Sequence, residues 1–308
     1  MNFEDALCKN MREFQQGMRK AVMLLTLLLG QYCMAQTDIV FQLTKEHGHF
    51  FCETTLNGVN AKVMVESGVP GLMMSAAFYE AHKDSLQLEV KESDEKIRYL
   101  GGLRHIKYTA QGRLQIGGAF FEGPIKIIHE DHAMMIPIQM LHHPLDNSAI
   151  VRIDLGKSQL SVCCRKNIQS LSPNVTALNL TYNQFGMPVI TASLDIKADG
   201  QKVSITGQFI TDMGNASLLF LNKSDTVIEK LVREGKLRLH DARDNRTGKV
   251  VAQGVYAEKL SICNRTYKGV SVGVSTFKSL TECGFLGLKF FTMPAVFDFD
   301  ENKLYLFN

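Results

Sequence analysis

An internal repeat constrains the fold of this 308-residue chain more than any other feature. Glu66 and Asp212 are separated by 146 residues, and Gly68 and Gly214 have the same separation. Each carboxylate follows an apolar stretch and precedes a glycine by two positions. A repeat long enough to form a domain predicts two copies of one folded unit, packed against each other.

Two longer pairs of segments support the repeat and indicate its secondary structure. Residues 113–128 match residues 259–274, and residues 151–162 match residues 296–307. In each segment apolar and polar residues alternate, stop at turn residues and then alternate again. This pattern predicts four β-hairpins, two in each copy.

The predicted fold is therefore all-β, with two barrel-like lobes related by a pseudo-twofold axis. We expect an N-terminal lobe over residues 36–170 and a C-terminal lobe over residues 171–308. The segment 165–175 is polar and contains a proline, which is typical of a linker.

Each lobe is predicted to contain one short helix, soon after its carboxylate. The first covers residues 75–86 and begins with Ser75 as its N-cap. The second covers residues 224–235, with Ser224 as N-cap and a glycine at its end.

Residues 1–35 have the pattern of a signal peptide. Arg19 and Lys20 precede an apolar run at residues 21–30, and Ala35 supplies a small residue at a cleavage-like position. The run is shorter than the roughly 20 residues needed to cross a bilayer. We therefore expect an exported protein, periplasmic or extracellular, with no integral membrane span in its mature chain.

Two details of this segment qualify the expectation. Acidic residues are unusual in such a signal, so residues 1–17 are interpreted as a misplaced start and Met18 as the simpler one. Cys33 raises the alternative of a lipid anchor. Tyr32 precedes it where lipidation signals need a small residue, so lipid anchoring is not expected.

Composition excludes several functions. The net charge is +3 and the two signs are interspersed, which gives no basic stripe for nucleic acid. Five cysteines follow residue 35, too few for a disulfide scaffold, although one bridge stays open. The histidine pairs within 129–132 and 142–143 are predicted to lie in solvated loops, so no metal site is expected. No cofactor is predicted.

The repeated carboxylates can share one site. Each ends an apolar strand and enters a tight turn, where the glycine permits close backbone approach. The pseudo-twofold axis would bring Glu66 and Asp212 together, and two adjacent carboxyl groups share one proton. One member can then act as general base on a water while the other polarises a carbonyl. The alternative is that both are ordinary turn residues.

These features resemble the pepsin-like and retropepsin-like aspartic proteases, specifically bacterial, exported, two-lobed members. The two turns that carry the resemblance are Glu66-Ser67-Gly68 and Asp212-Met213-Gly214, against the family pattern Asp-Thr/Ser-Gly. Phe285-Leu286-Gly287 and the closing hairpin at 295–308 also fit the family. The resemblance covers most of the chain after residue 35 and implies the acid protease fold.

The resemblance also implies supporting roles. Phe285, Leu286 and Gly287 would pack beneath the second turn. A β-hairpin flap would lie within residues 98–111 and close over the substrate, with Tyr108 as its tip aromatic and Tyr99 as the alternative.

Three departures bear on activity. Glu66 stands where the family has aspartate, and its extra methylene adds roughly 1.5 Å, enough to cost about a hundredfold in rate. Met213 replaces a hydroxyl residue that links the two turns, a link to which Ser67 could still contribute. In the first lobe the apolar-apolar-Gly element becomes Met135-Ile136-Pro137.

The resemblance implies an aspartic-type endopeptidase that cleaves an extended peptide or protein through a water activated by Glu66 and Asp212. The alternative is a catalytically inactive module that binds a peptide or a cell-wall fragment, and a third hypothesis is a structural component of the cell envelope. Cleavage gained on converting Glu66 to aspartate would favour the enzyme. A serine nucleophile at Ser67 lacks the G-x-S-x-G context. The sequence leaves the oligomeric state open.

Overall fold

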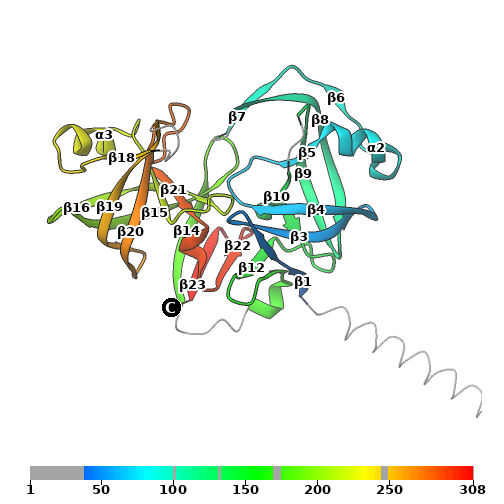
Figure 1. Cartoon of the computed structure of the whole chain (residues 1–308). Coiled ribbons are helices and arrows are strands. Elements are labelled where there is room, and N and C mark those ends of the chain that lie inside the picture. The colour runs from blue at the N-terminus through cyan, green and yellow to red at the C-terminus, as the bar shows by residue number, and fades with distance from the viewer. Residues whose placement is uncertain (1–37, 100–101, 131–132, 169–174, 244–248, 308) are drawn as a thin grey trace, which may run out of the picture. The chain divides into compact units, whose positions relative to one another are not determined.

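A computed structural model describes residues 38–99, 102–130, 133–168, 175–243 and 249–307 (Figure 1). Residues 39–308 form one compact unit. The predicted signal peptide, its cleavage position and Cys33 lie outside the described residues, as does most of the predicted lobe boundary. Among the described residues no helix is long and apolar enough to span a membrane.

We call the elements up to β13 the N-terminal lobe. The bounds of its strands and helices are β1 (Ile39–Gln42), β2 (Thr44–Glu46), β3 (His49–Leu56), β4 (Val59–Glu66), β5 (Leu72–Ser75), α2 (Ala76–Leu86), β6 (Lys91–Glu92), β7 (Lys96–Tyr99), β8 (Gly102–Ile116), β9 (Ala119–Ile128), β10 (Met134–Pro137), η1 (Ile138–Met140), β11 (Leu141–His142), β12 (Ile150–Asp154) and β13 (Gln159–Val162).

The remaining elements form the connection and the C-terminal lobe. Their bounds are η2 (Arg165–Ile168), β14 (Val175–Tyr182), β15 (Pro188–Ala198), β16 (Gln201–Asp212), β17 (Leu219–Asn222), α3 (Thr226–Arg233), β18 (His240–Arg243), β19 (Val250–Ile262), β20 (Arg265–Ser275), β21 (Gly284–Gly287), η3 (Leu288–Phe291), β22 (Ala295–Asp298) and β23 (Lys303–Phe307).

The two lobes repeat one topology, as predicted. In the first, β4 pairs in parallel with β10, and Glu66 faces Pro137. In the second, β16 pairs in parallel with β21, and Asp212 faces Gly287. The strand that follows each carboxylate also pairs in parallel with another strand of its own lobe. β5 pairs with β9, and β17 pairs with β20. Both carboxylates therefore end equivalent strands.

The predicted hairpins are present in both lobes. The segment 113–128 contains the turn of the β8–β9 hairpin with the adjoining parts of both strands, and the segment 259–274 does the same for β19–β20. In the second turn Cys263 and Asn264 both have positive φ, the geometry that suits a two-residue hairpin loop. The segments 151–162 and 296–307 form β12–β13 and β22–β23.

A sheet between the lobes makes the pseudo-twofold relation visible. It is part of a 13-stranded sheet, in which six strands run in the order β1-β13-β12-β22-β23-β14, so that equivalent strands of the two lobes lie at equal distances from the centre of the six. The two central strands are antiparallel, with Val151 opposite Phe297. The axis that relates the lobes therefore passes between β12 and β22.

Helix α2 has the predicted N-cap, because the Ser75 side chain accepts the amide of Phe78. The prediction of Ser224 for α3 is wrong by one residue. Asp225 is the N-cap, and its carboxylate accepts the amides of Val227 and Ile228. A carboxylate that accepts two N–H groups is the stronger cap at this position.

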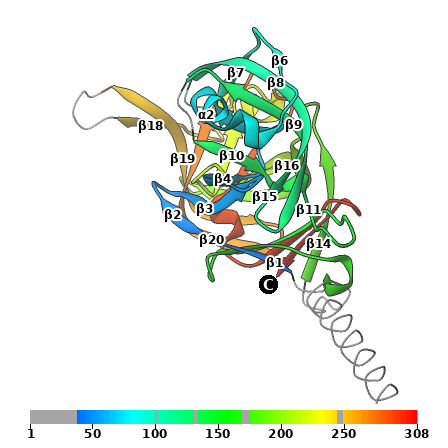
Figure 2. The same ribbon diagram turned by 90° about the vertical axis from the view of Figure 1, so that its right-hand side faces the viewer.

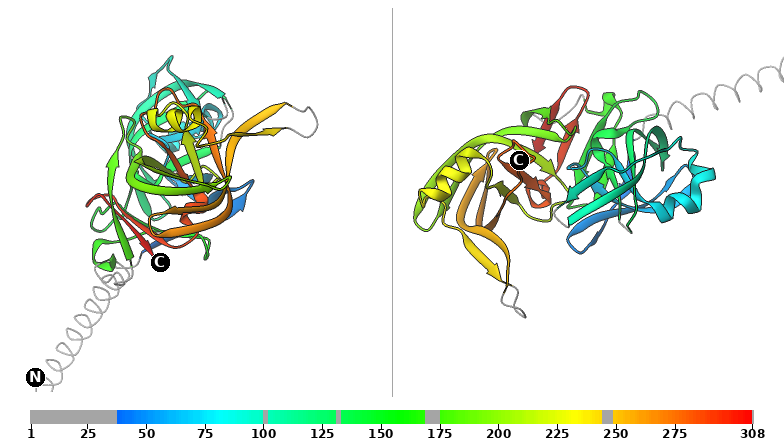
Figure 3. Two further views of the ribbon diagram at one scale, coloured as in Figure 1. Left: turned by 90° about the vertical axis from the view of Figure 1, so that its left-hand side faces the viewer. Right: turned by 90° about the horizontal axis from the view of Figure 1, so that it is seen from above.

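The predicted linker is only partly irregular. Its first four residues form the 3₁₀ helix η2, and residues 169–174 lie outside the described part. In the C-terminal lobe the hairpin of β18 and β19 extends away from the other strands (Figures 2 and 3). All four residues of β18 are exposed.

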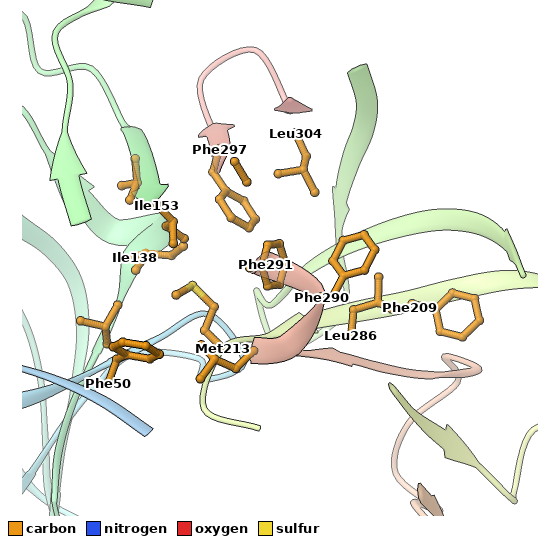
Figure 4. Packing of buried hydrophobic residues seen from close by; sticks show 14 of the residues in the cluster. Phe50, Ile138, Ile153, Phe209, Met213, Leu286, Phe290, Phe291, Phe297 and Leu304 are labelled. Atoms are coloured by element: carbon orange, nitrogen blue, oxygen red, sulfur yellow. The ribbon is translucent and has the colours of Figure 1, made fainter. Parts of the chain in front are cut away.

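One hydrophobic core runs through both lobes. It includes Val151 and Leu160 of the first lobe and Phe297 and Leu304 of the second. At the centre Phe290, Phe291 and Phe297 pack in a chain of ring contacts, with centroids 5.1 and 5.5 Å apart (Figure 4). Such a shared core fixes the strands that carry the two turns.

Most of the described cysteines and several methionines are buried. The cysteines in the described ranges are thiols rather than disulfides. Met73, Met74 and Met134 are buried in the core. The prediction of a solvated loop for His143 is wrong, because that side chain is buried.

Candidate active site

The two turns meet through a hydrogen-bonded clasp around Ser67. The Ser67 hydroxyl donates to the carbonyl of Thr211 at 2.8 Å and accepts the amide of Met213 at 3.1 Å. Ser67 is completely buried, which leaves its hydroxyl no access to a substrate. The clasp joins residue 67 of one lobe to residues 211 and 213 of the other.

Glu66 accepts three backbone amides on one oxygen. Its Oε1 lies 2.8 Å from the amide nitrogens of Ser67 and Gly68, and 2.9 Å from that of Gly214 in the opposite turn. The side chain is buried, with 4% of its surface exposed. Three converging N–H groups stabilise negative charge at this oxygen.

The glycines of both turns make room for the opposing carboxyl groups. A Cβ on Gly68 would lie 2.7 Å from Asp212 Oδ1, and a Cβ on Gly214 would collide with Glu66 Oε2. Each carboxyl group therefore lies over the glycine of the other turn. Glu66 and Asp212 are thus brought together by the lobes, and both glycines are needed for their approach.

The surroundings of Asp212 favour its protonated form. Burial of the carboxyl raises its pKa well above the ordinary value, and so do the charge of Glu66 and a hydrogen bond with it. The amides of Asn215 and Gly214 act in the opposite direction and are outweighed. A proton on Asp212 removes the repulsion between two carboxylate charges at this contact.

The strand beneath the second turn has the expected form. Leu286 is completely buried and Phe285 is half-buried, in the strand that runs parallel to β16. A Cβ on Gly287 would lie 2.6 Å from the Asn215 carbonyl oxygen. This position accepts glycine alone, because the turn passes directly over it.

The first lobe supports its turn differently. Pro137 occupies the position that faces Glu66, so the degenerate element Met135-Ile136-Pro137 keeps the strand pairing. The side-chain amide of Gln139 donates to the carbonyl of Val69 at 3.0 Å. In the second lobe the backbone amide of Leu288 makes the related contact to Asn215, at 2.7 Å.

Met213 lies in the hydrophobic core. It packs near Ile138 of η1 and Phe291 of η3, one from each lobe (Figure 4). Its side chain is 1% exposed. The methionine therefore replaces a polar link between the turns by apolar contact between the lobes.

A hairpin in the predicted flap region is present, but its aromatic tip is not Tyr108. Strands β7 and β8 turn between Tyr99 and Gly102, which face each other. Tyr108 lies further along β8, opposite Ile127, with its ring 5.7 Å from that of Tyr79. The prediction of Tyr108 is wrong because alternation along residues 98–111 does not show where the hairpin reverses. Tyr99 borders the turn, and its side chain lies outside the described residues.

Two supporting residues escaped prediction. Gln139 has no matching amide in the other copy, where Lys289 stands, so the repeat gives no signal for it. Asn222 is completely buried and binds the loop before β21 through three carbonyls. An asparagine that ends an apolar strand is the one sequence signal for such a role. No cluster of metal-binding side chains occurs in the described ranges.

Comparison with known proteins shows the fold. No protein-family model matches the sequence, and no curated protein matches it. The crystal structure of an aspartic proteinase from Irpex lacteus aligns with 88% of this chain and 97% of its own, at a TM-score of 0.55 and 12% identity. The chain therefore has the two-lobed, pepsin-like fold of the aspartic proteinases.

A second solved structure also aligns. It is basic 7S globulin from soybean, which covers 88% of this chain and 95% of its own at 10% identity. Its TM-score of 0.49 is too low to support an argument about this chain.

Proposed function

We propose that this protein is an aspartic-type endopeptidase that hydrolyses an extended peptide through Glu66 and Asp212. One observation carries the proposal: the two carboxyl groups converge from equivalent turns, and burial together with Glu66 raises the pKa of Asp212. A buried pair with one shared proton is the arrangement that general acid–base hydrolysis requires.

The chemistry needs only these two groups and a water. Glu66 accepts a proton from the water as the oxygen of that water bonds to the substrate carbonyl carbon. At the same time Asp212 donates its proton to the carbonyl oxygen. The tetrahedral intermediate then collapses with cleavage of the C–N bond. Glu66 returns its proton to the departing amine, and Asp212 regains a proton from the intermediate.

Peptide binding follows from the strands around the pair. The hairpin of β7 and β8 exposes backbone groups that can bind an extended chain by β-strand addition. Val69, next to the first turn, and Met73 form a small apolar cluster with Ile97 of β7 packed against it.

The departures from the family pattern are compatible with this function. Met213 is directed into the core, so it does not separate the carboxyl groups. Pro137 preserves the parallel pairing under Glu66. The signal-like residues 1–35 support an exported enzyme, which we propose together with the activity.

A second candidate is a module that binds a peptide or a cell-wall fragment without cleaving it. The close approach of the two turns favours this candidate, because each carboxyl group lies against the glycine of the opposite turn and little room is left for an attacking water. The longer side chain of Glu66 closes that gap. Binding without cleavage would then be the activity of the site.

The test is hydrolysis of a diverse peptide library between pH 3 and 8 by the full chain. We expect cleavage by the wild type and a loss of about 10²–10⁴-fold in both Glu66→Gln and Asp212→Asn. Glu53→Gln, an exposed glutamate on the neighbouring strand β3, is the matched control and should retain activity. Peptide binding by every variant, with cleavage by none, would establish the binding module and overturn the enzyme.

A further inference from the structure

The clasp around Ser67 is complete on one side only. Residues 65, 66 and 67 match residues 211, 212 and 213 across the repeat. On one side the Met213 amide donates to the Ser67 hydroxyl, and that hydroxyl donates to the Thr211 carbonyl. The symmetric contacts would need a hydroxyl at position 213, which methionine lacks.

The amide of Ser67 nevertheless has a partner. In a symmetric clasp it would donate to the side chain at position 213. It donates instead to Glu66 Oε1, at 2.8 Å. Ser67 is completely buried, so this amide would otherwise be an unsatisfied donor, which is costly.

The length of Glu66 explains how it reaches this amide. In the matching turn the Met213 amide donates to the Ser67 hydroxyl, at 3.1 Å, and the Gly214 amide donates to Glu66 Oε1, at 2.9 Å. Glu66 accepts the amides one and two positions after it, of Ser67 and Gly68. The extra methylene lets the carboxyl group turn back toward the first amide of its own turn.

We propose that Glu66 and Met213 are a compensating pair: the glutamate binds the Ser67 amide that a hydroxyl at position 213 would bind in a symmetric clasp. Glu66 is then a positioning residue for the turn as well as a member of the carboxyl pair. Replacement of Glu66 by aspartate alone therefore damages the site, and a hydroxyl at position 213 repairs the damage.

A mutant cycle tests the pair without relying on enzyme activity. The variants are Glu66→Asp, Met213→Thr and the double mutant, with Met213→Val as the isosteric partner that lacks the hydroxyl. Hydrogen exchange of the Ser67 amide is the readout, and thermal unfolding is the second. The cavity left by the methionine is nearly the same for threonine and valine, so their difference isolates the hydroxyl.

We expect exchange protection of the Ser67 amide to fall about tenfold in Glu66→Asp, the scale of one hydrogen bond. It should recover in Glu66→Asp/Met213→Thr and remain low in Glu66→Asp/Met213→Val. Equal protection in the two double mutants would overturn the proposal, as would full protection in Glu66→Asp alone. These results stand even if the wild type cleaves no peptide, which would refute the proposed function only.

Discussion

Asp212 is the residue whose chemistry depends most on its neighbours. Burial, the charge of Glu66 and the hydrogen bond between them all raise its pKa. The folded protein therefore binds more protons at Asp212 than the unfolded chain does, at any pH between the ordinary and the raised value. This difference links protonation of the site to the stability of the fold.

The first prediction concerns stability against pH. The contribution of Asp212 is fully present below the ordinary aspartate pKa, and it is lost as the pH rises through the raised pKa. Asp212→Asn cannot ionise, so we expect its free energy of unfolding to fall less than that of the wild type between pH 4 and pH 8. Urea unfolding at several pH values measures this difference.

The control for this prediction is Asp199→Asn, an exposed aspartate in the β15–β16 turn. Its stability should follow the wild type at every pH. If the free energy of unfolding changed with pH in the same way for Asp212→Asn and the wild type, the Asp212 carboxyl would not be the group responsible for the pH dependence. If the protein is an enzyme, the same raised pKa places the alkaline limit of its activity above that of an isolated aspartate.

At the scale of elements, the second turn depends on a loop that precedes β21. Asn222 ends β17, and its side chain both donates hydrogen bonds to this loop and accepts one from it. Its amide donates to the carbonyls of Phe277, Leu280 and Glu282 at 3.1–3.3 Å, and its oxygen accepts the amides of Ser224 and Phe277 at 3.0 Å. The loop leads into β21, whose last residue, Gly287, is the pairing partner of Asp212.

Removal of the Asn222 side chain should therefore disturb both stability and site. For Asn222→Ala we expect a loss of about 3 kcal/mol in the free energy of unfolding, because several buried carbonyl and amide groups lose their partner. Asn60→Ala, at an exposed position of β4, is the control and should change stability by less than about 0.5 kcal/mol. Chemical denaturation measures both, and equal effects would contradict the role of Asn222.

The elements were predictable where the pattern was periodic. Alternation of apolar and polar residues located the hairpins of β8–β9 and β22–β23, and the repeat related the first to β19–β20 and the second to β12–β13. The wrong predictions concern the position of a residue within an element. Ser224 and Asp225 are adjacent and both suit an N-cap, and only the geometry of the helix decides between them. Tyr108 was misplaced because a long strand continues through the flap region.

At the scale of the whole molecule, an ion cluster closes the connection between the lobes. Arg165, just after β13, donates to both carboxylate oxygens of Asp298 at the end of β22. It also contacts Asp300, at 2.6 Å. Asp298 is completely buried, and these contacts raise the pKa of Arg165. The lobe junction therefore depends on one arginine.

Loss of this arginine should destabilise the molecule as a unit. For Arg165→Met we expect a loss of about 3 kcal/mol, because the buried carboxylate of Asp298 loses its partner. Asp298→Asn in the same chain should recover part of the loss. The control is Lys62→Met, which removes an exposed ion pair with Glu46 and should cost less than about 1 kcal/mol. Thermal unfolding compares them, and equal losses would contradict the role of Arg165.

We expect each of these variants to unfold in a single transition, because one hydrophobic core runs through both lobes. Sequence alone predicted the lobes and the meeting of Glu66 and Asp212. It could not predict the three amides on Glu66 Oε1 or the cluster at Arg165. The Gly214 amide on Glu66 and the Asp298 carboxylate on Arg165 come from segments more than 100 positions away, and only the folded chain defines their approach.

The palindromic order of the sheet between the lobes has a consequence for the chain's two halves. Either half alone would present β12 or β22 as an open edge, ready to accept a second copy of itself in the antiparallel manner of the intact chain. A pair of N-terminal halves would bring two serines face to face and complete the clasp from both sides. A pair of C-terminal halves would oppose two methionines and complete neither. Of the two halves, only the first therefore carries the hydroxyl that the clasp requires.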